Sequence, residues 1–371
     1  MGARARTRTR TKPAEYTAPM RIAVLTSGGD APGMNAAIRT VALAGQHRGH
    51  EVLGVRSGYE GLLAGDVQTV GVGSTDGITG LGGTILGSAR CHTFPTPEGQ
   101  VQALARLREL KIDALVVIGG NGSLTGATLL ARSGVCKVIG LPASIDNDIG
   151  HCGLAIGVDT AVNTIVDACD RISDTARAHR RAFVVEVMGR RCGFLAMRAG
   201  IAAEADAVLY GERQPPEEEV IARLRAILKR NFSPARNKKR VLIVKSEGMT
   251  LTTHRLVERL QAHLREDAPG VEVRESILGH IVRGGHPTAL DRSIAQRLAF
   301  HAVLCAEQGQ TDVMLGWEVP GNAGQATLDP SVRMIPLADV LEETARLLDG
   351  TSPVVTKRVE LLNLVEDLMS V

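Results

Sequence analysis

Two aspartates stand two residues apart in the segment LPASIDNDIG, residues 141–150. The segment follows a short apolar run, and along an extended chain Asp146 and Asp148 would point the same way. Two carboxylates placed like this can have different roles in catalysis, because one can act as a general base while the other faces a metal ion. The alternative is a surface turn, for which aspartate and asparagine are also common residues.

Three glycine-rich segments lie in the first third of the chain: TSGGDAPGMNAAIR at 26–39, GGTILGSAR at 82–90 and IGGNGSL at 118–124. Glycines such as Gly28 let backbone amides approach an anion closely, and a helix that opens after the loop adds the positive end of its dipole. Each segment alone could be an ordinary tight turn between a strand and a helix. Three of them together predict a phosphate-binding site.

Arginines and a histidine in the second half of the chain suggest another anion site. The planar guanidinium fork donates two hydrogen bonds at once and so suits phosphate. Any one of these residues alone would be taken as a surface charge, but the group is Arg181, Arg274, His280 and Arg283. Two anion sites and a pair of aspartates predict phosphoryl transfer from a nucleotide to a phosphorylated small molecule.

Strands and helices alternate along the chain. The apolar, β-rich runs are 21–25, 113–119, 137–141, 182–187, 206–210 and 240–246. The helical stretches are about 34–46, 99–110, 124–132, 159–172, 217–230, 253–266, 288–307 and 356–369. Continuous apolar runs are typical of strands buried on both faces of a parallel sheet. The pattern therefore predicts an α/β protein with doubly wound sheets, whose ligands bind at the carboxyl ends of the strands.

Composition narrows the class of protein. The chain has 371 residues, enough for two lobes, and its formal charge of +3 gives no argument for nucleic acid as a partner. No apolar run of 18 residues occurs, so we expect no membrane span. The six cysteines show no metal-binding spacing, which favours reduced thiols and a cytoplasmic location. Much of the positive charge lies in the basic first twelve residues, and we expect residues 1–19 to form a disordered tail.

Six segments, in their order and spacing, closely resemble the bacterial 6-phosphofructokinase family: TSGGDAPGMNAAIR, GGTILGSAR, ALVVIGGNGS, IDNDI, VVEVMGR and LGHIVRGG. The resemblance runs from about residue 20 to about residue 335. It implies two doubly wound, Rossmann-like lobes with mainly parallel sheets. Residues 20–156 plus about 287–335 would bind nucleotide, and residues 157–286 would bind sugar phosphate. Residues 336–371 would form a helical extension.

The resemblance also implies roles for individual residues. Asp146 would take the proton from the 1-hydroxyl of fructose 6-phosphate, Ser144 would donate to the phosphoryl group, and Arg190 would stabilise its charge. The residues implied to bind ATP are Gly28, Arg90, Cys91, Gly120, Asn121, Gly122 and Ser123. Those implied to bind the sugar phosphate are Ser144, Ile145, Asp146, Arg181, Met188, Gly189, Arg190, Glu247, Arg274, His280, Ile281, Val282 and Arg283. In the family, the residues that correspond to Arg181 and Arg274 come from a neighbouring subunit, which implies a homotetramer with shared sites.

The phosphoryl donor and the metal depend on three positions. Pyrophosphate-using relatives carry aspartate where this chain has Gly122 and lysine where it has Ala143, so ATP is favoured. The usual family loop is GGDGS, whose aspartate contacts Mg²⁺. Here Asn121 takes its place, with Asp148 as the second candidate ligand, so we expect weaker use of Mg²⁺ and slower turnover.

The sequence is compatible with three hypotheses for the function. The leading one is an ATP-dependent 6-phosphofructokinase of glycolysis. A second is a kinase that acts on another sugar phosphate, such as sedoheptulose 7-phosphate, or that draws on pyrophosphate. A third is a non-catalytic regulatory paralogue that binds a sugar phosphate, and it is motivated by Asn121 alone.

Overall fold

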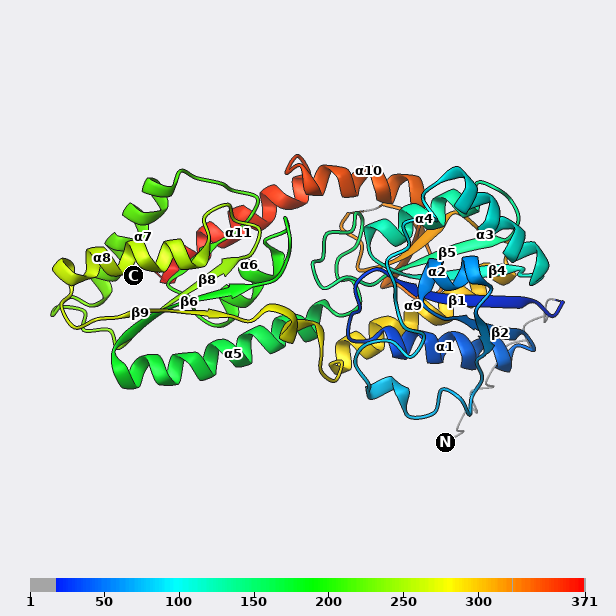
Figure 1. Cartoon of the computed structure of the whole chain (residues 1–371), viewed down its shortest axis with the longest axis horizontal. Coiled ribbons are helices and arrows are strands. Elements are labelled where there is room, and N and C mark those ends of the chain that lie inside the picture. Colours follow the sequence, from blue (N-terminus) through cyan, green and yellow to red (C-terminus); the bar gives the residue numbers. More distant parts are fainter. Residues whose placement is uncertain (1–17, 322, 370–371) are drawn as a thin grey trace, which may run out of the picture.

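The computed structural model describes residues 18–321 and 323–369, so most of the predicted tail over 1–19 lies outside the described residues. The chain folds into two lobes that lie end to end, each built around its own sheet (Figure 1). Both sheets are mainly parallel and covered by helices. The predicted α/β class with doubly wound sheets is therefore confirmed.

The first lobe contains the larger sheet. Its eight strands are β1 (Arg21–Ser27), β2 (Glu51–Val55), β3 (Val67–Thr69), β4 (Ala114–Gly119), β5 (Lys137–Pro142), β10 (Val313–Trp317), β11 (Gln325–Ala326) and β12 (Val332–Pro336), in the order β11-β12-β10-β5-β4-β1-β2-β3. Its helices are α1 (Met34–His47), α2 (Gly58–Ala64), the short η1 (Ile78–Gly80), α3 (Pro97–Glu109), α4 (Asn121–Ala131), α9 (Ala289–Glu307) and α10 (Leu337–Leu348). The five central strands run parallel, while β3, β11 and β12 pair antiparallel at the edges.

Alternate residues of β1 show why this sheet is covered on both faces. Ile22 and Val24 belong to the hydrophobic core that contains α1 and α9. Ala23 and Leu25 belong to a second core, built with α2, α3, α4 and α10. Successive side chains of a strand point to opposite faces. An uninterrupted apolar run therefore fills two cores at once.

The second lobe contains a four-stranded parallel sheet in the order β7-β8-β6-β9. Its strands are β6 (Arg181–Val187), β7 (Ala207–Leu209), β8 (Arg240–Ser246) and β9 (Val273–Ile277). Its helices are α5 (Val158–His179), α6 (Phe194–Ala202), α7 (Glu217–Asn231), α8 (Thr253–Asp267), the short η2 (Gly279–Arg283) and α11 (Pro353–Met369). Among the described residues, no helix is long and apolar enough to span a membrane.

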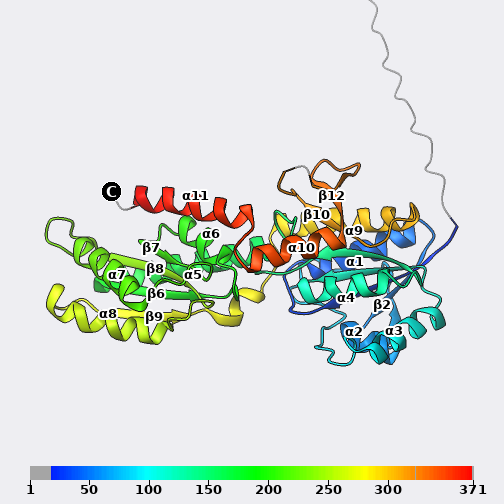
Figure 2. The same cartoon turned by 90° about the horizontal axis from the view of Figure 1, so that it is seen from above.

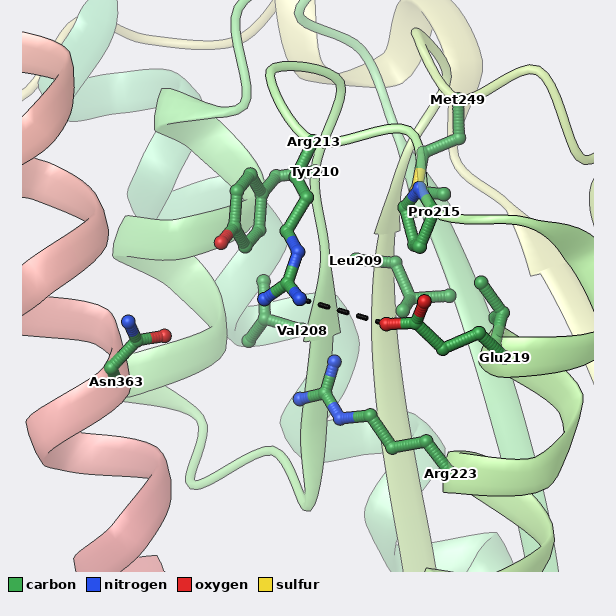
Figure 3. Close-up of a pocket in the computed structure, with 10 residues that line it drawn as sticks. Val208, Leu209, Tyr210, Arg213, Pro215, Glu219, Arg223, Met249 and Asn363 are labelled. Atoms are coloured by element: carbon green, nitrogen blue, oxygen red, sulfur yellow. Dashed lines mark ion pairs between the residues drawn. The ribbon is translucent and has the colours of Figure 1, made fainter.

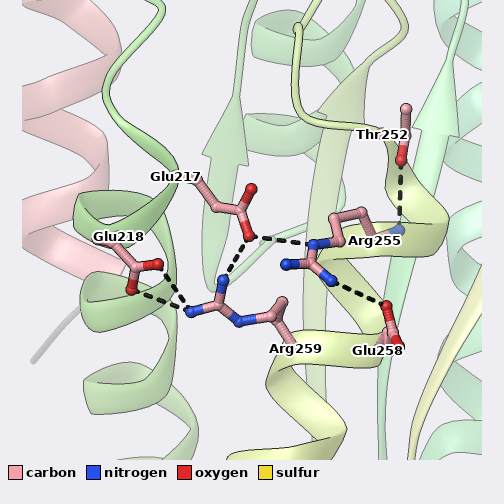
Figure 4. Close-up of polar contacts among 6 residues, drawn as sticks. All are labelled: Glu217, Glu218, Thr252, Arg255, Glu258 and Arg259. Carbon is pink, nitrogen blue, oxygen red and sulfur yellow. Dashed lines mark hydrogen bonds and ion pairs between the residues drawn. The ribbon is translucent and has the colours of Figure 1, made fainter.

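Ion pairs join α7 to α8 in the second lobe (Figure 4). Glu217 accepts hydrogen bonds from Arg255 at 3.2 Å and from Arg259 at 2.6 Å. Arg259 also reaches Glu218 at 2.9 Å, and the Thr252 side chain caps the start of α8. Exposed ion pairs contribute only about 0–1 kcal/mol each. This network therefore helps to align the two helices more than it stabilises the lobe.

The chain crosses between the lobes where α5 begins, where η2 leads into α9, and where α10 leads into α11 (Figures 1 and 2). The first two crossings meet at Asp291, which is fully buried. Its carboxylate accepts from the Gly157 amide at 2.9 Å, the Thr160 amide at 2.7 Å and the Thr160 hydroxyl at 2.6 Å. Asp291 of α9 thus binds the first turn of α5 and ties the two crossings together.

Replacing Asp291 by alanine is expected to destabilise the protein by roughly 2–4 kcal/mol, because three buried donors lose their acceptor. Asp291→Asn keeps the shape and one acceptor oxygen, so it should lose less. Urea denaturation followed by circular dichroism measures both variants. If Asp291→Ala unfolds at the wild-type urea concentration, the carboxylate does not stabilise this crossing.

Candidate active site

The candidate site lies where the strand order of the larger sheet reverses. From β1 the chain proceeds to β2 on one side, whereas β4 proceeds to β5 on the other. Ser27 at the end of β1 lies opposite Gly119 at the end of β4. In open α/β sheets, ligands bind at the carboxyl ends of the strands at such a switch point. The loops that follow these two strands are the first and third glycine-rich segments.

The three glycine-rich segments form one wall of the site. The Ser88 hydroxyl donates to the Gly28 carbonyl at 2.5 Å, and the Thr26 hydroxyl donates to the Gly87 carbonyl at 2.8 Å. A Cβ atom at Gly119 would lie 2.5 Å from the Ser27 carbonyl oxygen, so only glycine fits there. The three segments therefore contact one another in the structure.

The wall borders a cavity of about 380 Å³. Its lining includes these predicted residues: Gly28, Arg90, Cys91, Gly120, Asn121, Gly122, Ser123, Ser144, Asp146, Asp148, Arg190 and Arg283. Helix α4 begins at Asn121 without a side-chain cap, so the amides of its first turn are available to an anion at this wall. The cavity therefore brings the phosphate-binding loops and the paired aspartates together.

The sequence analysis did not predict two aromatic residues that line the cavity. Tyr59 and Phe94 stack with their ring centroids 4.1 Å apart, and both line the cavity. The Tyr59 hydroxyl donates to the Ser123 carbonyl at 2.7 Å and so holds the first turn of α4. Aromatic residues make up only 2% of this chain. Phe94 follows the second glycine-rich segment by four residues, which was the available signal for it, whereas Tyr59 lies far from all three segments in the sequence.

Asp146 is the more deeply buried of the two aspartates that line the cavity. Burial raises its pKa to about 6, with a further increase from Asp148, while Arg190 and Arg283 act in the opposite direction. The Arg190 Nε atom lies 3.4 Å from Oδ2, and Oδ1 has no hydrogen-bond partner among the described residues. Asp146 is thus ionised at neutral pH and has one oxygen available to accept a proton.

Asn121, Ser144 and Asp148 form a polar cluster beside Asp146. The Asn121 amide nitrogen donates to Asp148 Oδ2 at 2.9 Å, and the Ser144 hydroxyl donates to Asp148 Oδ1 at 3.2 Å. Burial raises the pKa of Asp148, whereas the hydrogen bond from Ser144 lowers it. The Asn121 Oδ1 atom is buried without a hydrogen-bond partner among the described residues.

These oxygens fit a magnesium ion that is also held by phosphate. Mg²⁺ prefers oxygen ligands and usually takes only one or two from the protein when it is bound with a nucleotide. Within the described ranges, no group of three or more histidine, cysteine or acidic side chains could hold a metal by itself. Asp148 and the unpartnered oxygen of Asn121 would therefore be the protein's contribution.

The loop that carries the aspartates is a turn, so the expectation of an extended segment was wrong. Residues 145–146 form the turn, and Asn147 adopts a left-handed backbone with φ of 51°. The Asn147 side chain donates to the Gly153 carbonyl and accepts from the Ala155 amide, each at 3.0 Å. Asn147 therefore holds the turn, and both aspartates still line the cavity.

Several residues predicted to bind the sugar phosphate lie next to the cavity. Glu247 accepts from the amides of Gly189 at 3.2 Å and Arg190 at 2.9 Å, so it supports the loop after β6. Met188 lies in the same loop and is buried. Arg283 enters the cavity and donates to the Asp30 carbonyl at 3.4 Å.

Other predicted residues do not line the cavity. Arg181 and Arg274 both pair with Glu272, at 2.8 and 2.9 Å, and these pairs lower the pKa of Glu272. Arg181 begins β6 while Arg190 follows its end, and a strand of seven residues is roughly 20 Å long. Within one copy of the chain, Arg181 and Arg274 therefore lie away from Asp146, in contrast to Arg190. Three more predicted residues lie in η2, where His280 and Ile281 are exposed and Val282 is buried. Ile145, which precedes Asp146 in the sequence, is fully buried.

The fold and the cavity define an α/β protein whose glycine-rich loops and paired aspartates line one cavity at the reversal of strand order. The family model described as Phosphofructokinase matches residues 21–306. The chain is 45% identical over 297 residues to ATP-dependent 6-phosphofructokinase 2 of Bacteroides thetaiotaomicron, covering 80% of this chain and 88% of that protein. It is also 45% identical over 295 residues to the ATP-dependent 6-phosphofructokinase of Thermotoga neapolitana, covering 80% and 89%.

Solved structures with a similar fold are also phosphofructokinases. The phosphofructokinase of Saccharomyces cerevisiae matches with a TM-score of 0.83 and 32% identity over 95% of this chain, which spans about half (50%) of that protein. A pyrophosphate-dependent phosphofructokinase from Marinobacter aquaeolei matches with a TM-score of 0.73 and 18% identity, covering 92% of this chain and 91% of that one, a likeness of fold alone. The chain belongs to the phosphofructokinase family.

Proposed function

We propose that this protein transfers the terminal phosphoryl group of ATP to the 1-hydroxyl of fructose 6-phosphate, giving fructose 1,6-bisphosphate and ADP. The observation that carries the proposal is Asp146, which shares a cavity with the glycine-rich loops. It is a buried carboxylate, and one of its oxygens has no hydrogen-bond partner in the part of the chain that the structure describes. The names of the relatives at about 45% identity support the same activity.

The chain's own residues suggest how the reaction proceeds. Asp146 accepts the proton of the sugar hydroxyl as that oxygen attacks phosphorus. Arg190, 3.4 Å from the Asp146 carboxylate, places a positive charge beside the group in transfer. Backbone amides at the start of α4 hold the phosphates of the donor. A magnesium ion held by Asp148 and Asn121 would neutralise part of the charge on those phosphates.

The identity of the donor rests on Gly122. Among the described residues, nothing beyond its own turn of α4 and its chain neighbours lies within 4 Å of a Cβ atom built at this position, so the cavity is open here and leaves room for the rest of a nucleotide. Ala143 adds only one methyl group to the lining. A coupled assay with ATP and pyrophosphate side by side tests the proposal. Turnover with ATP supports it, and turnover with pyrophosphate alone would overturn it.

Two alternatives are tested by the same assay. A kinase for another sugar phosphate would show a higher kcat/KM with sedoheptulose 7-phosphate than with fructose 6-phosphate. A non-catalytic paralogue, which the neutral Asn121 alone favours, would bind fructose 6-phosphate in calorimetry and show no turnover at any Mg²⁺ concentration.

The proposal extends to assembly and location. Arg181 and Arg274 lie away from the cavity of their own chain, which supports shared sites in a homotetramer where these arginines reach a neighbour's sugar phosphate.

All six cysteines are free thiols, which supports a reducing compartment, and we propose the cytoplasm.

Replacing Arg274 by alanine is expected to raise the KM for fructose 6-phosphate about tenfold, the effect of losing roughly 1.4 kcal/mol of binding, with a smaller change in kcat. The reason is that a phosphate clamp binds substrate and transition state alike. Arg265→Ala, which removes another exposed arginine of the same lobe, is the matched control and should leave KM unchanged. A fully active monomer in analytical ultracentrifugation would contradict the shared site.

A further inference from the structure

The loop between β6 and α6 carries Arg190 in a conformation that needs support. Gly189 has φ of 142° and Arg190 has φ of 50°, a left-handed backbone that non-glycine residues rarely adopt. A Cβ atom at Gly189 would lie 2.4 Å from the Cys192 carbonyl oxygen, so the turn is tight. A strained conformation of this kind persists only where surrounding contacts hold it.

Two carboxylates hold the loop at its two ends. Glu247 accepts from the Gly189 and Arg190 amides, as described above. At the other end, both carboxylate oxygens of Glu212 lie 2.8 Å from the Gly193 amide nitrogen. A Cβ atom at Gly193 would lie 2.5 Å from Glu212 Oε2, so the carboxylate is seated directly against the backbone.

A third contact comes from Arg358, on the C-terminal helix α11. Its guanidinium carbon lies 4.7 Å from the centre of the Phe194 ring, and Nη1 donates to Cys192 Sγ at 3.7 Å. These two residues flank Gly193. Arg358 therefore contacts the loop on both sides of the residue that Glu212 binds.

The charge of Arg358 also reaches an acidic group beside the loop. Burial raises the pKa of Glu212, and Arg358 opposes this increase. One guanidinium thus contacts the loop and favours the ionised form of the carboxylate that binds the Gly193 amide.

Buried apolar residues hold helix α11 against the second lobe. It packs against α6, with Leu362 fully buried and Val355 nearly so. Figure 2 shows it running beside α6 after the chain has crossed from the first lobe. Farther along the helix, Asn363 lines a cavity of about 190 Å³ that also borders Tyr210 and Arg213 (Figure 3). The contact with the Arg190 loop is made by the Arg358 end of the helix.

We propose that Arg358 is a positioning residue for phosphoryl transfer: by contacting Cys192 and Phe194, it holds the loop that presents Arg190 to Asp146. This inference rests on the proposed function. Residue 358 lies beyond the matched range 21–306 and is not among the residues that line the cavity, so Arg358 would act on the site through the loop.

The test uses Arg358→Met, which keeps an apolar stem against Phe194 but removes the charge and the donors. We expect kcat to fall roughly tenfold, because a displaced Arg190 stabilises the transition state less well. The KM for fructose 6-phosphate and the unfolding temperature should change little. Hydrogen exchange of the peptide 188–194 should become about tenfold faster because the loop opens more often.

Two further variants make the outcome decisive. Arg358→Lys retains a cation over the ring and should recover most of kcat, whereas Asn363→Ala, on the same helix, should match the wild type in every measurement. If Arg358→Met does not fold, Phe194→Leu can be tested in its place. This variant removes the aromatic ring that Arg358 contacts and should show the same changes to a smaller extent.

A wild-type kcat with unchanged exchange in Arg358→Met would overturn the proposal. So would a loss of kcat that merely follows a lower unfolding temperature and is not recovered by Arg358→Lys. If the wild type itself shows no kinase activity, the proposed function fails, and the exchange measurement still decides whether Arg358 holds the loop.

Discussion

Replacing Asp146 by asparagine is expected to lower kcat by roughly 10²–10⁴-fold, the usual effect of removing a general base. Asparagine keeps the shape of the side chain and the buried position but cannot accept the proton of the sugar hydroxyl. Fructose 6-phosphate should still bind, because the cationic groups proposed to hold its phosphate are unchanged. Steady-state kinetics measures the loss, and calorimetry with the sugar phosphate measures the binding that remains.

The pH dependence provides a second check on Asp146. Its pKa is raised to about 6, chiefly by burial, so the base is ionised at neutral pH and becomes protonated as the pH falls through that value. The wild-type kcat/KM should therefore decline below about pH 6, and the residual rate of Asp146→Asn should not show this decline. Asp170→Asn, which removes an exposed carboxylate on α5, should retain the wild-type profile. An Asp146→Asn enzyme with more than a tenth of the wild-type kcat would place the base elsewhere.

Several of the parallel strands could be predicted because their residues fill two cores at once, whereas β2 and β10, which also lie among the five central strands, were missed. The runs around β1, β4, β5, β6 and β8 are continuously apolar, and each is a strand in the structure. Strand β9 was missed because it is the edge of its sheet and exposes Arg274, Glu275 and Ile277. Helix α6 was missed for the opposite reason, since its sequence FLAMRAGIA is apolar almost all round and shows no polar stripe.

The candidate site was predictable where function demands an unusual local sequence. Glycine-rich loops that bind phosphate leave such a pattern, as does a pair of aspartates directly after a strand. Glu212 and Arg358 leave none, because an acidic residue in a loop and an arginine on a surface helix are common in any sequence. Their roles follow from contacts with the Arg190 loop, which only the fold brings near to them.

Asn121→Asp is expected to make the protein depend more sharply on Mg²⁺. In the wild type, the Asn121 amide donates to Asp148 at 2.9 Å, so the pair is stable without a metal. An aspartate at this position would place two carboxylates in contact. Two unit charges 4 Å apart interact by up to about 4 kcal/mol at an effective dielectric constant near 20. That interaction is repulsive between the carboxylates and attractive toward a cation between them.

The structure therefore predicts two opposite effects of one substitution. Without Mg²⁺, Asn121→Asp should unfold at a lower temperature than the wild type, because the hydrogen bond to Asp148 is lost and the carboxylates repel. With Mg²⁺ and ATP, the concentration of metal needed for half-maximal activity should fall by roughly tenfold or more, since each additional 1.4 kcal/mol of binding is a factor of ten. Thermal unfolding and a coupled assay, each titrated with Mg²⁺, measure the two effects separately. Asn163→Asp adds the same charge on the exposed face of α5 and should change neither. An Asn121→Asp protein with wild-type stability in the absence of metal and wild-type Mg²⁺ dependence would show that Asn121 neither supports Asp148 nor faces the ion.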